Sequence, residues 1–331
     1  MTTIRDVAKE AGLSTATVSR ALSSPETLSK ENLKKVQFAI EKLQYRPNML
    51  SQKFRNKTAK SIVILVPNIA NLFFTTVIRG IETVAQRRGF SVLLGDTRDS
   101  SSQEEEYINL VETRQADGII QLRPYNDFDS ALPRSQVLAV NASGCENTPY
   151  PSVRIDNIGA AKEVVKYLIS IGHSRIGVIT GLKTNPHAIE RLEGYRKALS
   201  EAAITYDPKL VLEGDFSYWS GLNASAQFAN MAPPPTAIFC MNDQMAIGAM
   251  KGFKERGMRI PQDISITGFD DLEVSRYLDP PLTTVAQPAE KIGEKSAELL
   301  FQLIDKLDPS QTEYVLPIEF VLRGSTAAPR K

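Results

Sequence analysis

The sequence predicts an all-α N-terminal domain followed by an α/β body that contains two doubly wound parallel-sheet subdomains. Two observations lead to this fold class. Residues 1–60 hold 12 Lys and Arg against 5 Asp and Glu, whereas the remaining residues hold 27 against 33. The basic segment has apolar residues at helical spacing, and from Ser61 onward apolar strands alternate with amphipathic helices. A basic segment joined to an acidic body is typical of a protein that meets a polyanion with one end.

The composition bounds the class of protein. The 331 residues suffice for two or three domains, and the hydrophobic content of 42% is typical of a soluble globular protein. Cys145 and Cys240 are too few for a disulfide framework and lack metal-type spacing, which favours a reducing cytoplasm. The N-terminus MTTIRDVAKEAG lacks a signal-peptide pattern, and no apolar run approaches about 18 residues. We therefore expect neither secretion nor a membrane span.

The first sixty residues predict three helices. Thr3 can cap the first helix, and Gly12 ends it. Ser14 or Thr15 caps a second helix, and a third spans residues 30–43. Two short helices joined by a Gly-containing turn make a helix-turn-helix. The expected inward-facing residues are Ile4, Val7, Ala8 and Ala11, then Val18, Ala21 and Leu22, then Leu33, Val36, Ile40 and Leu43.

The second helix, within STATVSRAL, is rich in short hydroxyl side chains that are middling helix formers. Such residues suit a recognition helix, because they let it sit deep in the major groove of DNA and bond phosphates or base edges. Arg20 would read guanine through O6 and N7. The alternative is a surface helical hairpin in which Arg20 is a solvated charge. The predicted DNA contacts of this domain are Thr3, Ser14, Thr15, Ala16, Thr17, Ser19 and Arg20.

From Ser61 the chain alternates between buried-strand and helix patterns. Repeated strand–helix units indicate parallel sheets with helices on both faces. Ligands then bind outside the carboxyl ends of the strands, in the crevice between subdomains. The expected strands are SIVILVP, FSVLLGD, DGIIQL, RIGVITG, TAIFCMND and ISITGFDD, and the expected helices include FFTTVIRGIETVAQRRG, SQEEEYINLVETRQ and QMAIGAMKGFKERG.

Aromatic and polar residues follow the predicted strands. Phe73 and Phe216 could stack on a ring, while Asp270 and Arg191 make charge-assisted bonds to its hydroxyls or nitrogens. These residue types suit a polar ring-shaped metabolite. Structural alternatives stand beside this interpretation. We expect one of Phe73 and Phe74 to be core, Asp270 could cap a helix, and Arg191 could pair with a neighbour on a wet helix face.

The segments IRDVAKEAGLSTATVSRAL and LQYRPNMLSQKFR closely resemble the lactose-repressor (LacI) family of bacterial transcription regulators. The resemblance implies a hinge helix at about Asn48–Arg55 that lies in the minor groove and forms when two subunits meet on operator DNA. Where the family usually has Ala-Arg-x-Leu, this chain has Ser51, Gln52, Lys53 and Phe54. Phe54 could still be the apolar wedge that kinks the duplex, or it could pack under the next domain. The implied DNA contacts here are Asn48, Ser51 and Phe54.

The resemblance extends to the body through segments such as GHSRIGVITG, PPPTAIFCMNDQMAIGAM and IPQDISITGFDD. It implies a periplasmic-binding-protein-like body with two subdomains, three crossovers and an effector between them. IRGIE, GDF and the C-x-x-D of FCMND are most like nucleoside-responsive members of the cytidine type. Asn242 is more typical of sugar-responding members, so both effector classes stay open. The implied effector contacts are Phe73, Phe74, Asn185, His187, Arg191, Phe216, Asn242 and Asp270.

These features predict a cytoplasmic, homodimeric transcriptional repressor whose affinity for a palindromic DNA operator is controlled by a nucleoside, purine or sugar. The expected domains are a helix-turn-helix domain at 1–46, a hinge and linker at 47–60, and an effector-binding and dimerisation body at 61–331. The alternative function is that of a periplasmic-type solute-binding protein without a DNA role. With only two histidines and no GxSxG, phosphate loop or metal cluster, we expect no enzyme activity, no catalytic residue, no cofactor and no metal.

Overall fold

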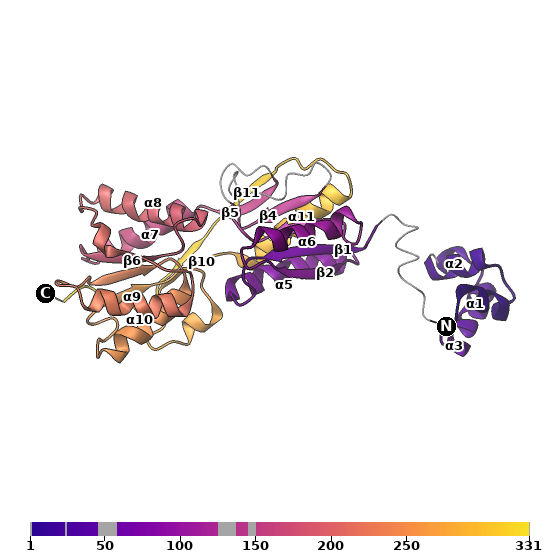
Figure 1. The fold of residues 1–331 in the computed structure, drawn as a ribbon, viewed down its shortest axis with the longest axis horizontal. Coiled ribbons are helices and arrows are strands. Elements are labelled where there is room, and N and C mark those ends of the chain that lie inside the picture. Colours follow the sequence, from indigo (N-terminus) through magenta and orange to yellow (C-terminus); the bar gives the residue numbers. More distant parts are fainter. Residues whose placement is uncertain (1, 24, 46–57, 125–136, 145–149, 331) are drawn as a thin grey trace. The chain divides into compact units, whose positions relative to one another are not determined.

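The structure is a computed structural model that describes residues 2–23, 25–45, 58–124, 137–144 and 150–330. The chain divides into two compact units, Met1–Ala59 and Lys60–Lys331. Figure 1 colours both units along the sequence, from the indigo helices of the N-terminal unit to the yellow C-terminal part of the body unit.

Three α-helices and a 3-10 turn make up the described part of the N-terminal unit, which confirms the predicted helix-turn-helix. Its core is small because each helix is short. Val7, Val18 and Val36, one from each helix, are at most 1% exposed and pack with Ala8, Ala21 and Ala39. The helical spacing of apolar residues therefore identifies the buried faces correctly. The elements are α1 (Ile4–Ala11), α2 (Thr15–Ser23), η1 (Pro25–Thr27) and α3 (Lys30–Lys42).

Local hydrogen bonds fix where these helices begin and end. The Asp6 carboxylate accepts from the backbone N–H and the hydroxyl of Thr3, both at 2.8 Å, so Thr3 stands at the start of α1 as predicted. Gly12 ends α1 with a φ of 65°, which glycine adopts without a steric cost. Of the two candidate caps for α2, Ser14 is used, because its Oγ accepts the Thr17 N–H at 3.1 Å.

The described part of the body unit contains two large sheets and one strand pair. The first sheet has the order β11-β5-β4-β3-β1-β2, and the second has the order β7-β6-β8-β9. Neighbouring strands in both are parallel, as predicted, whereas β10 and β12 form an antiparallel pair. The strands are β1 (Ser61–Val66), β2 (Ser91–Asp96), β3 (Ile119–Gln121), β4 (Ala139–Ala142), β5 (Ser152–Ile155), β6 (Ile176–Thr180), β7 (Val211–Glu213), β8 (Ala237–Cys240), β9 (Ser265–Thr267), β10 (Thr284–Ala286), β11 (Glu313–Leu316) and β12 (Glu319–Val321).

The chain passes between the two sheets three times. It leaves the first sheet after β5, returns through β10 into α11, and leaves again from β11 into β12. The first subdomain therefore combines the early strands with C-terminal elements, because α11 packs on α5 and β11 pairs with β5. The helices are α5 (Leu72–Arg87), α6 (Ser101–Glu112), α7 (Asn157–Ser170), α8 (Pro186–Glu201), α9 (Tyr218–Ala229), α10 (Asp243–Glu255) and α11 (Ala289–Ile304), with short 3-10 turns η2 (Pro208–Leu210) and η3 (Glu273–Arg276).

Glycines let the helices of each subdomain cross at close range. A Cβ at Gly80 of α5 would overlap the carbonyl oxygen of Glu290, and a Cβ at Gly293 of α11 would overlap the carbonyl oxygen of Val77. The pair α9 and α10 uses the same device, with Gly221 in one helix and Gly248 in the other. Each glycine thus faces the backbone of its partner helix, and the two helix pairs are held in a fixed register.

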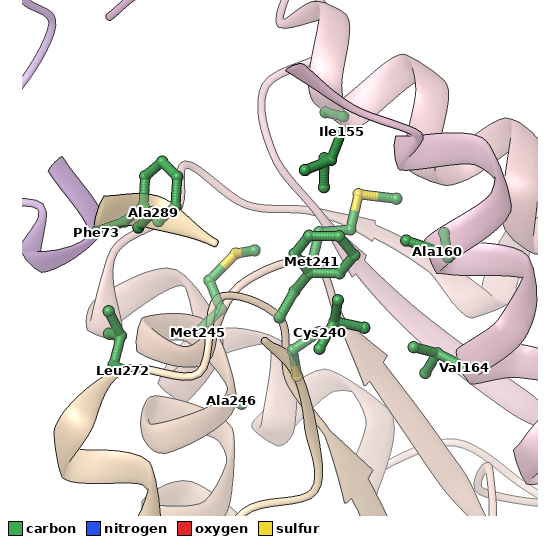
Figure 2. Packing of buried hydrophobic residues seen from close by; sticks show 14 of the residues in the cluster. Phe73, Ile155, Ala160, Val164, Cys240, Met241, Met245, Ala246, Leu272 and Ala289 are labelled. Carbon is green, nitrogen blue, oxygen red and sulfur yellow. The ribbon is translucent and has the colours of Figure 1, made fainter. Parts of the chain in front are cut away.

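One buried hydrophobic cluster extends through both subdomains. Figure 2 shows the part around Met241, which directly follows β8, with Ile155 and Ala160 on one side and Met245 of α10 on the other. Met241 and Met245 are fully buried. The core therefore lies directly beneath the carboxyl ends of the strands, and it gives the region above them a packed floor.

Candidate functional site

A cavity of about 130 Å³ lies in the body unit, at the carboxyl ends of strands from both sheets. Its position follows the general rule for parallel sheets, because each segment that lines it comes directly after a strand or a crossover. The structure brings all eight of the effector residues expected from the sequence to this one cavity. They are Phe73, Phe74, Asn185, His187, Arg191, Phe216, Asn242 and Asp270.

The aromatic side of the cavity is formed by Phe73, Phe74 and Phe216. The first two rings lie edge to face, with centroids 5.6 Å apart, and are 6% and 9% exposed. One of them was expected to be core, and in fact both belong to the hydrophobic cluster while both also line the cavity. Phe216 has a φ of 65°, and its ring occupies the space beside Gly181 where a Cβ would be.

Arg191 supplies a buried positive charge. It is only 4% exposed, so the alternative of an ion pair on a wet helix face is wrong. Its Nε donates to Asn157 Oδ1 at 2.8 Å, an η nitrogen donates to the Met241 carbonyl, and the guanidinium carbon lies 3.7 Å from the centre of the Phe269 ring. These contacts fix the direction of the guanidinium, and they partly offset the cost of burying it.

Two of the amide side chains also begin helices. Asn185 Oδ1 accepts the Ala188 N–H at 3.2 Å at the start of α8. Asn242 Oδ1 accepts the Met245 N–H at 2.9 Å at the start of α10, and its Nδ2 donates to the Phe216 carbonyl at 3.0 Å. The Asn242 amide therefore uses one acceptor and one donor in hydrogen bonds to the protein, which leaves it few hydrogen bonds to make with a ligand.

Asp270 and His187 are two titratable groups of the cavity whose charged forms are disfavoured by burial. Burial raises the pKa of Asp270 to about 8, against the opposing charge of Arg191. Burial, reinforced by the charge of Arg191, lowers the pKa of His187 to about 3. Near neutral pH, Asp270 therefore carries a proton that it can donate, and His187 is a neutral imidazole. Asp270 does not cap a helix. It accepts from Gln287 Nε2 at 2.7 Å.

Two larger spaces adjoin this cavity. One, of about 190 Å³, shares Asp99, Pro124, Leu182 and Asn185 with it. The other is an open groove of about 750 Å³ lined mainly by α5, α11 and the segment after β9, so size alone does not mark the candidate site. Phe73, Asp270 and Gln287 line both the cavity and the groove, and together they form the wall between them.

In the N-terminal unit, the predicted recognition helix exposes three of the four residues expected to face outward, and Ser19 is the exception. Thr15, Ala16 and Arg20 are exposed, while Thr17 and Ser19 are partly buried. The Ser14 and Thr17 hydroxyls lie 2.8 Å apart and hydrogen-bond to each other. Thr3 is exposed at the start of α1. The remaining predicted DNA contacts, Asn48, Ser51 and Phe54, lie outside the described residues, as does Cys145.

Two family descriptions match the chain: "Bacterial regulatory proteins, lacI family" over residues 3–48, and "Periplasmic binding protein-like domain" over residues 165–326. The HTH-type transcriptional repressor CytR of Escherichia coli is 37% identical over 329 residues, which cover 98% of this chain and 96% of that protein. The chain belongs to the LacI family. It is a DNA-binding transcriptional regulator with an effector-binding body.

Other LacI-family proteins match over nearly the whole chain. The repressor PurR of Vibrio atlanticus is 33% identical over 333 residues, with 98% of both chains covered. A crystal structure of the lac repressor dimer bound to operator and the anti-inducer ONPF has a TM-score of 0.90 at 30% identity, with 99% of both chains covered. A CelR–cellobiose complex has a TM-score of 0.74 at 29% identity, covering 98% of this chain and 100% of that one.

Sequence reasoning missed several residues of this LacI-family cavity. Gln287 is the clearest case, because it lies on the crossover between β10 and α11, where no strand of a large sheet ends. Asp99 and Asp215 could have been found, since each comes shortly after a strand. Among the described residues, no cluster of His, Cys, Asp and Glu could hold a metal ion, and no helix has the length and apolarity to cross a membrane. The missed lining residues are Pro67, Asn68, Asn71, Asp99, Pro124, Ser143, Leu182, Asp215 and Gln287.

Proposed function

We propose that this LacI-family chain is a homodimeric repressor that binds a palindromic operator, and that a small polar ring metabolite in the 130 Å³ cavity sets its operator affinity. One observation carries the proposal: side chains from segments that follow strands of both large sheets meet around a single cavity, in a chain that also has a DNA-binding helix-turn-helix. A metabolite-binding body joined to a DNA-binding domain is the architecture that ligand-controlled transcription requires.

The proposed operator contact rests on α2. Arg20, Thr15 and Ala16 are exposed on it. Arg20 can make two hydrogen bonds to guanine in the major groove, the Thr15 hydroxyl can bond a backbone phosphate, and the Ala16 methyl can contact a thymine methyl. A single headpiece buries too little surface for tight specific binding, so two copies are needed, and their two-fold axis would match a palindrome. The lac repressor structure, which is a dimer on its operator, supports this arrangement.

The proposed effector is a nucleoside, a purine or a sugar. A flat or puckered ring fits between the aromatic side of the cavity, at Phe73 and Phe216, and the polar side. There the protonated carboxyl of Asp270 donates to a ring nitrogen or hydroxyl, and Arg191 donates to an oxygen. The cellobiose complex of CelR supports the sugar class, whereas the likeness of the chain to nucleoside-responsive members supports the nucleoside class.

We infer that the cavity binds without catalysis. With a pKa of about 3, His187 is a weak base, and the described residues that line the cavity contain no nucleophile and base in hydrogen-bond contact. No cofactor is needed for binding. Because the proposed partner is chromosomal DNA, we also propose that the protein acts in the cytoplasm.

Trp219 offers a direct test of the effector. It is the only tryptophan in the chain, lies three residues after Phe216, and is 72% exposed. Titration with cytidine, uridine, adenosine, hypoxanthine, D-ribose and cellobiose should change its fluorescence and raise the melting temperature for the class that binds. Asp270→Ala is the matched variant, because it removes the hydrogen-bond donor that asparagine would keep. It should weaken the response while leaving DNA binding intact.

A gel-shift assay with genomic fragments, with and without these compounds, tests the operator. We expect a salt-sensitive shift of some fragments that a binding compound strengthens or releases. A ligand response without a shift of any fragment would favour the second candidate, a solute-binding protein without a DNA role. A shift that no compound changes would remove the proposed control by these effector classes.

A further inference from the structure

Asp243 is a buried carboxylate that does not line the cavity. It is the first residue of α10, directly after the cavity residue Asn242, and it is fully buried. Its Oδ2 accepts the Leu272 N–H at 2.8 Å and the Ser275 hydroxyl at 2.6 Å, and its Oδ1 accepts the Thr284 hydroxyl. A buried carboxylate with three donors is well satisfied, so these contacts are specific.

The three donors belong to two different segments. Leu272 and Ser275 lie in the loop after β9, whereas Thr284 begins β10, the crossover strand that returns the chain to the first subdomain. One carboxylate therefore joins the loop to the crossover. The Asp243 carboxylate packs closely against the backbone of Gly268, because a Cβ there would overlap Asp243 Oδ1.

The same loop holds the backbone of the cavity residue Asp270 in an energetically unfavourable conformation. Asp270 and Asp271 have φ angles of 116° and 54°, so two consecutive non-glycine residues occupy the left-handed region. Such backbone persists only where the surrounding structure holds it. The Asp270 N–H donates to the Val285 carbonyl in β10 at 2.8 Å, and Arg323 donates to Asp271 Oδ1 at 2.6 Å. The loop is thus bonded to the β10 crossover at Asp270 and to the segment after β12 at Asp271.

We propose that Asp243 is a positioning residue that ties the Asp270 loop to crossover strand β10, so that the cavity wall and the connection between subdomains move as one body. A ligand that bonds Asp270 then acts directly on the crossover. Gln287, which donates to Asp270, lies on the same crossover and completes the link. The inferred coupling between ligand and crossover rests on the proposed effector site. The link that Asp243 makes between the loop and β10 does not depend on that site.

Thr284→Val tests the tie, because it keeps the shape of the side chain and removes only the donor to Asp243 on the crossover side. Ser275→Ala cuts the loop side instead, in case the first variant is too unstable to study. Thr284→Ser restores the hydroxyl. Thr267→Val is the matched control, since Thr267 is equally buried in β9 and its hydroxyl donates to Ile238, not to Asp243.

Hydrogen exchange of the ligand-free full-length protein gives the first readout. In Thr284→Val, amides in residues 270–276 should exchange at least about tenfold faster than in wild type, while those of β6 and β8 keep their rates. Thr284→Ser and Thr267→Val should match wild type in residues 270–276. Unchanged exchange of this loop in both Thr284→Val and Ser275→Ala, with the proteins folded, overturns the inference.

The second readout is the DNA affinity with and without a probe, which is cytidine, adenosine or D-ribose. The DNA is a genomic fragment that the wild-type protein binds. Thr284→Val should bind the effective probe within about threefold of wild type, yet the probe-induced change in DNA affinity, typically about 5–150-fold in allosteric proteins, should fall below about twofold. Full retention of this change would also overturn the inference. If wild type responds to no probe, the proposed function fails for these ligands, and the exchange comparison still decides the tie.

Discussion

Arg20 and Asp270 show how the surroundings of one side chain set its chemistry. Arg20 is exposed on α2 and free to match a base pair, whereas Asp270 is 8% exposed in a wall of the cavity. Exposure keeps the guanidinium hydrated until DNA replaces the water, and burial keeps the carboxyl neutral until a ligand meets it.

Arg20→Ala should relax base preference at one operator position and cost about 1–3 kcal/mol of binding free energy, because the bidentate contact to guanine is lost. Binding to a set of single-base operator variants measures this. Lys34→Ala is the control, since it removes an exposed positive charge from α3 and should weaken all sequences alike. An unchanged base preference in Arg20→Ala would exclude Arg20 as a base-reading residue.

Asp270→Asn should stabilise the protein, and more so as the pH rises. With the pKa raised to about 8 by burial, the folded chain keeps a proton that the unfolded chain releases above about pH 4. The wild-type free energy of unfolding therefore falls between about pH 4 and pH 8, by up to about 5 kcal/mol at about 1.4 kcal/mol per pKa unit. Asparagine removes this penalty. Thermal unfolding near pH 5 and near pH 8 measures the difference.

Asp263→Asn is the control of opposite sign. Hydrogen bonds from Arg259 lower the pKa of Asp263 to about 2, so this carboxylate stabilises the fold above about pH 4 and its loss should destabilise it there. If wild type and Asp270→Asn change in parallel across the whole pH range, Asp270 is not a buried neutral carboxyl.

At the scale of secondary structure, the sequence predicts β1, β2, β3, β6, β8 and β9, and a long apolar run is the clearest signal. β1 and β6 are fully buried, and their continuous apolar runs make them easy to recognise. β11 and β12 escape prediction because both are short and partly exposed, so they lack that signal. Asn242 was implied as an effector contact by the resemblance to the LacI family, and its place after a strand also makes it the cap of α10.

The crossing of α5 and α11 gives a prediction at this scale. Gly80→Ala should destabilise the body by about 1–3 kcal/mol, because the new methyl group overlaps the Glu290 carbonyl and forces the helices apart. Urea unfolding measures the change. Gln86→Ala, at an exposed position of the same helix, should stay within about 0.5 kcal/mol of wild type. A gain of stability in Gly80→Ala would mean that helix propensity outweighs the packing.

At the scale of the whole molecule, the two units have net charges of opposite sign, which suits their different functions. The first 60 residues are strongly basic and the remainder is acidic, although the net charge of the chain is only +1. The basic unit attracts DNA, and the acidic body avoids nonspecific contact with it. This division is visible in the sequence because it depends on composition. The wall shared by Phe73, Asp270 and Gln287 is not, since it joins three segments that only the folded chain brings together.

DNA binding by the full-length protein should therefore depend steeply on salt. A protein with about 6–10 phosphate contacts loses roughly 10³–10⁵ in affinity between about 50 and 200 mM salt, and we expect a loss in this range for a dimer. Fluorescence anisotropy with a labelled fragment measures the slope. Lys209→Ala, an exposed body residue, should leave it unchanged. A shallow slope would place the DNA contacts outside the basic segment.

The late position of α11 and β11 in the chain has a consequence during translation. The ribosome releases the helix-turn-helix first. The sheet that begins with β1 lacks its edge strand β11, and α5 lacks its partner helix α11, until the last part of the message has been translated. Until then the nascent body exposes the face of Val77 and Ile81, which chaperones recognise. A prematurely terminated product therefore carries a DNA-binding head on a body that lacks part of its core, and incompletely folded bodies of this kind are substrates for proteases.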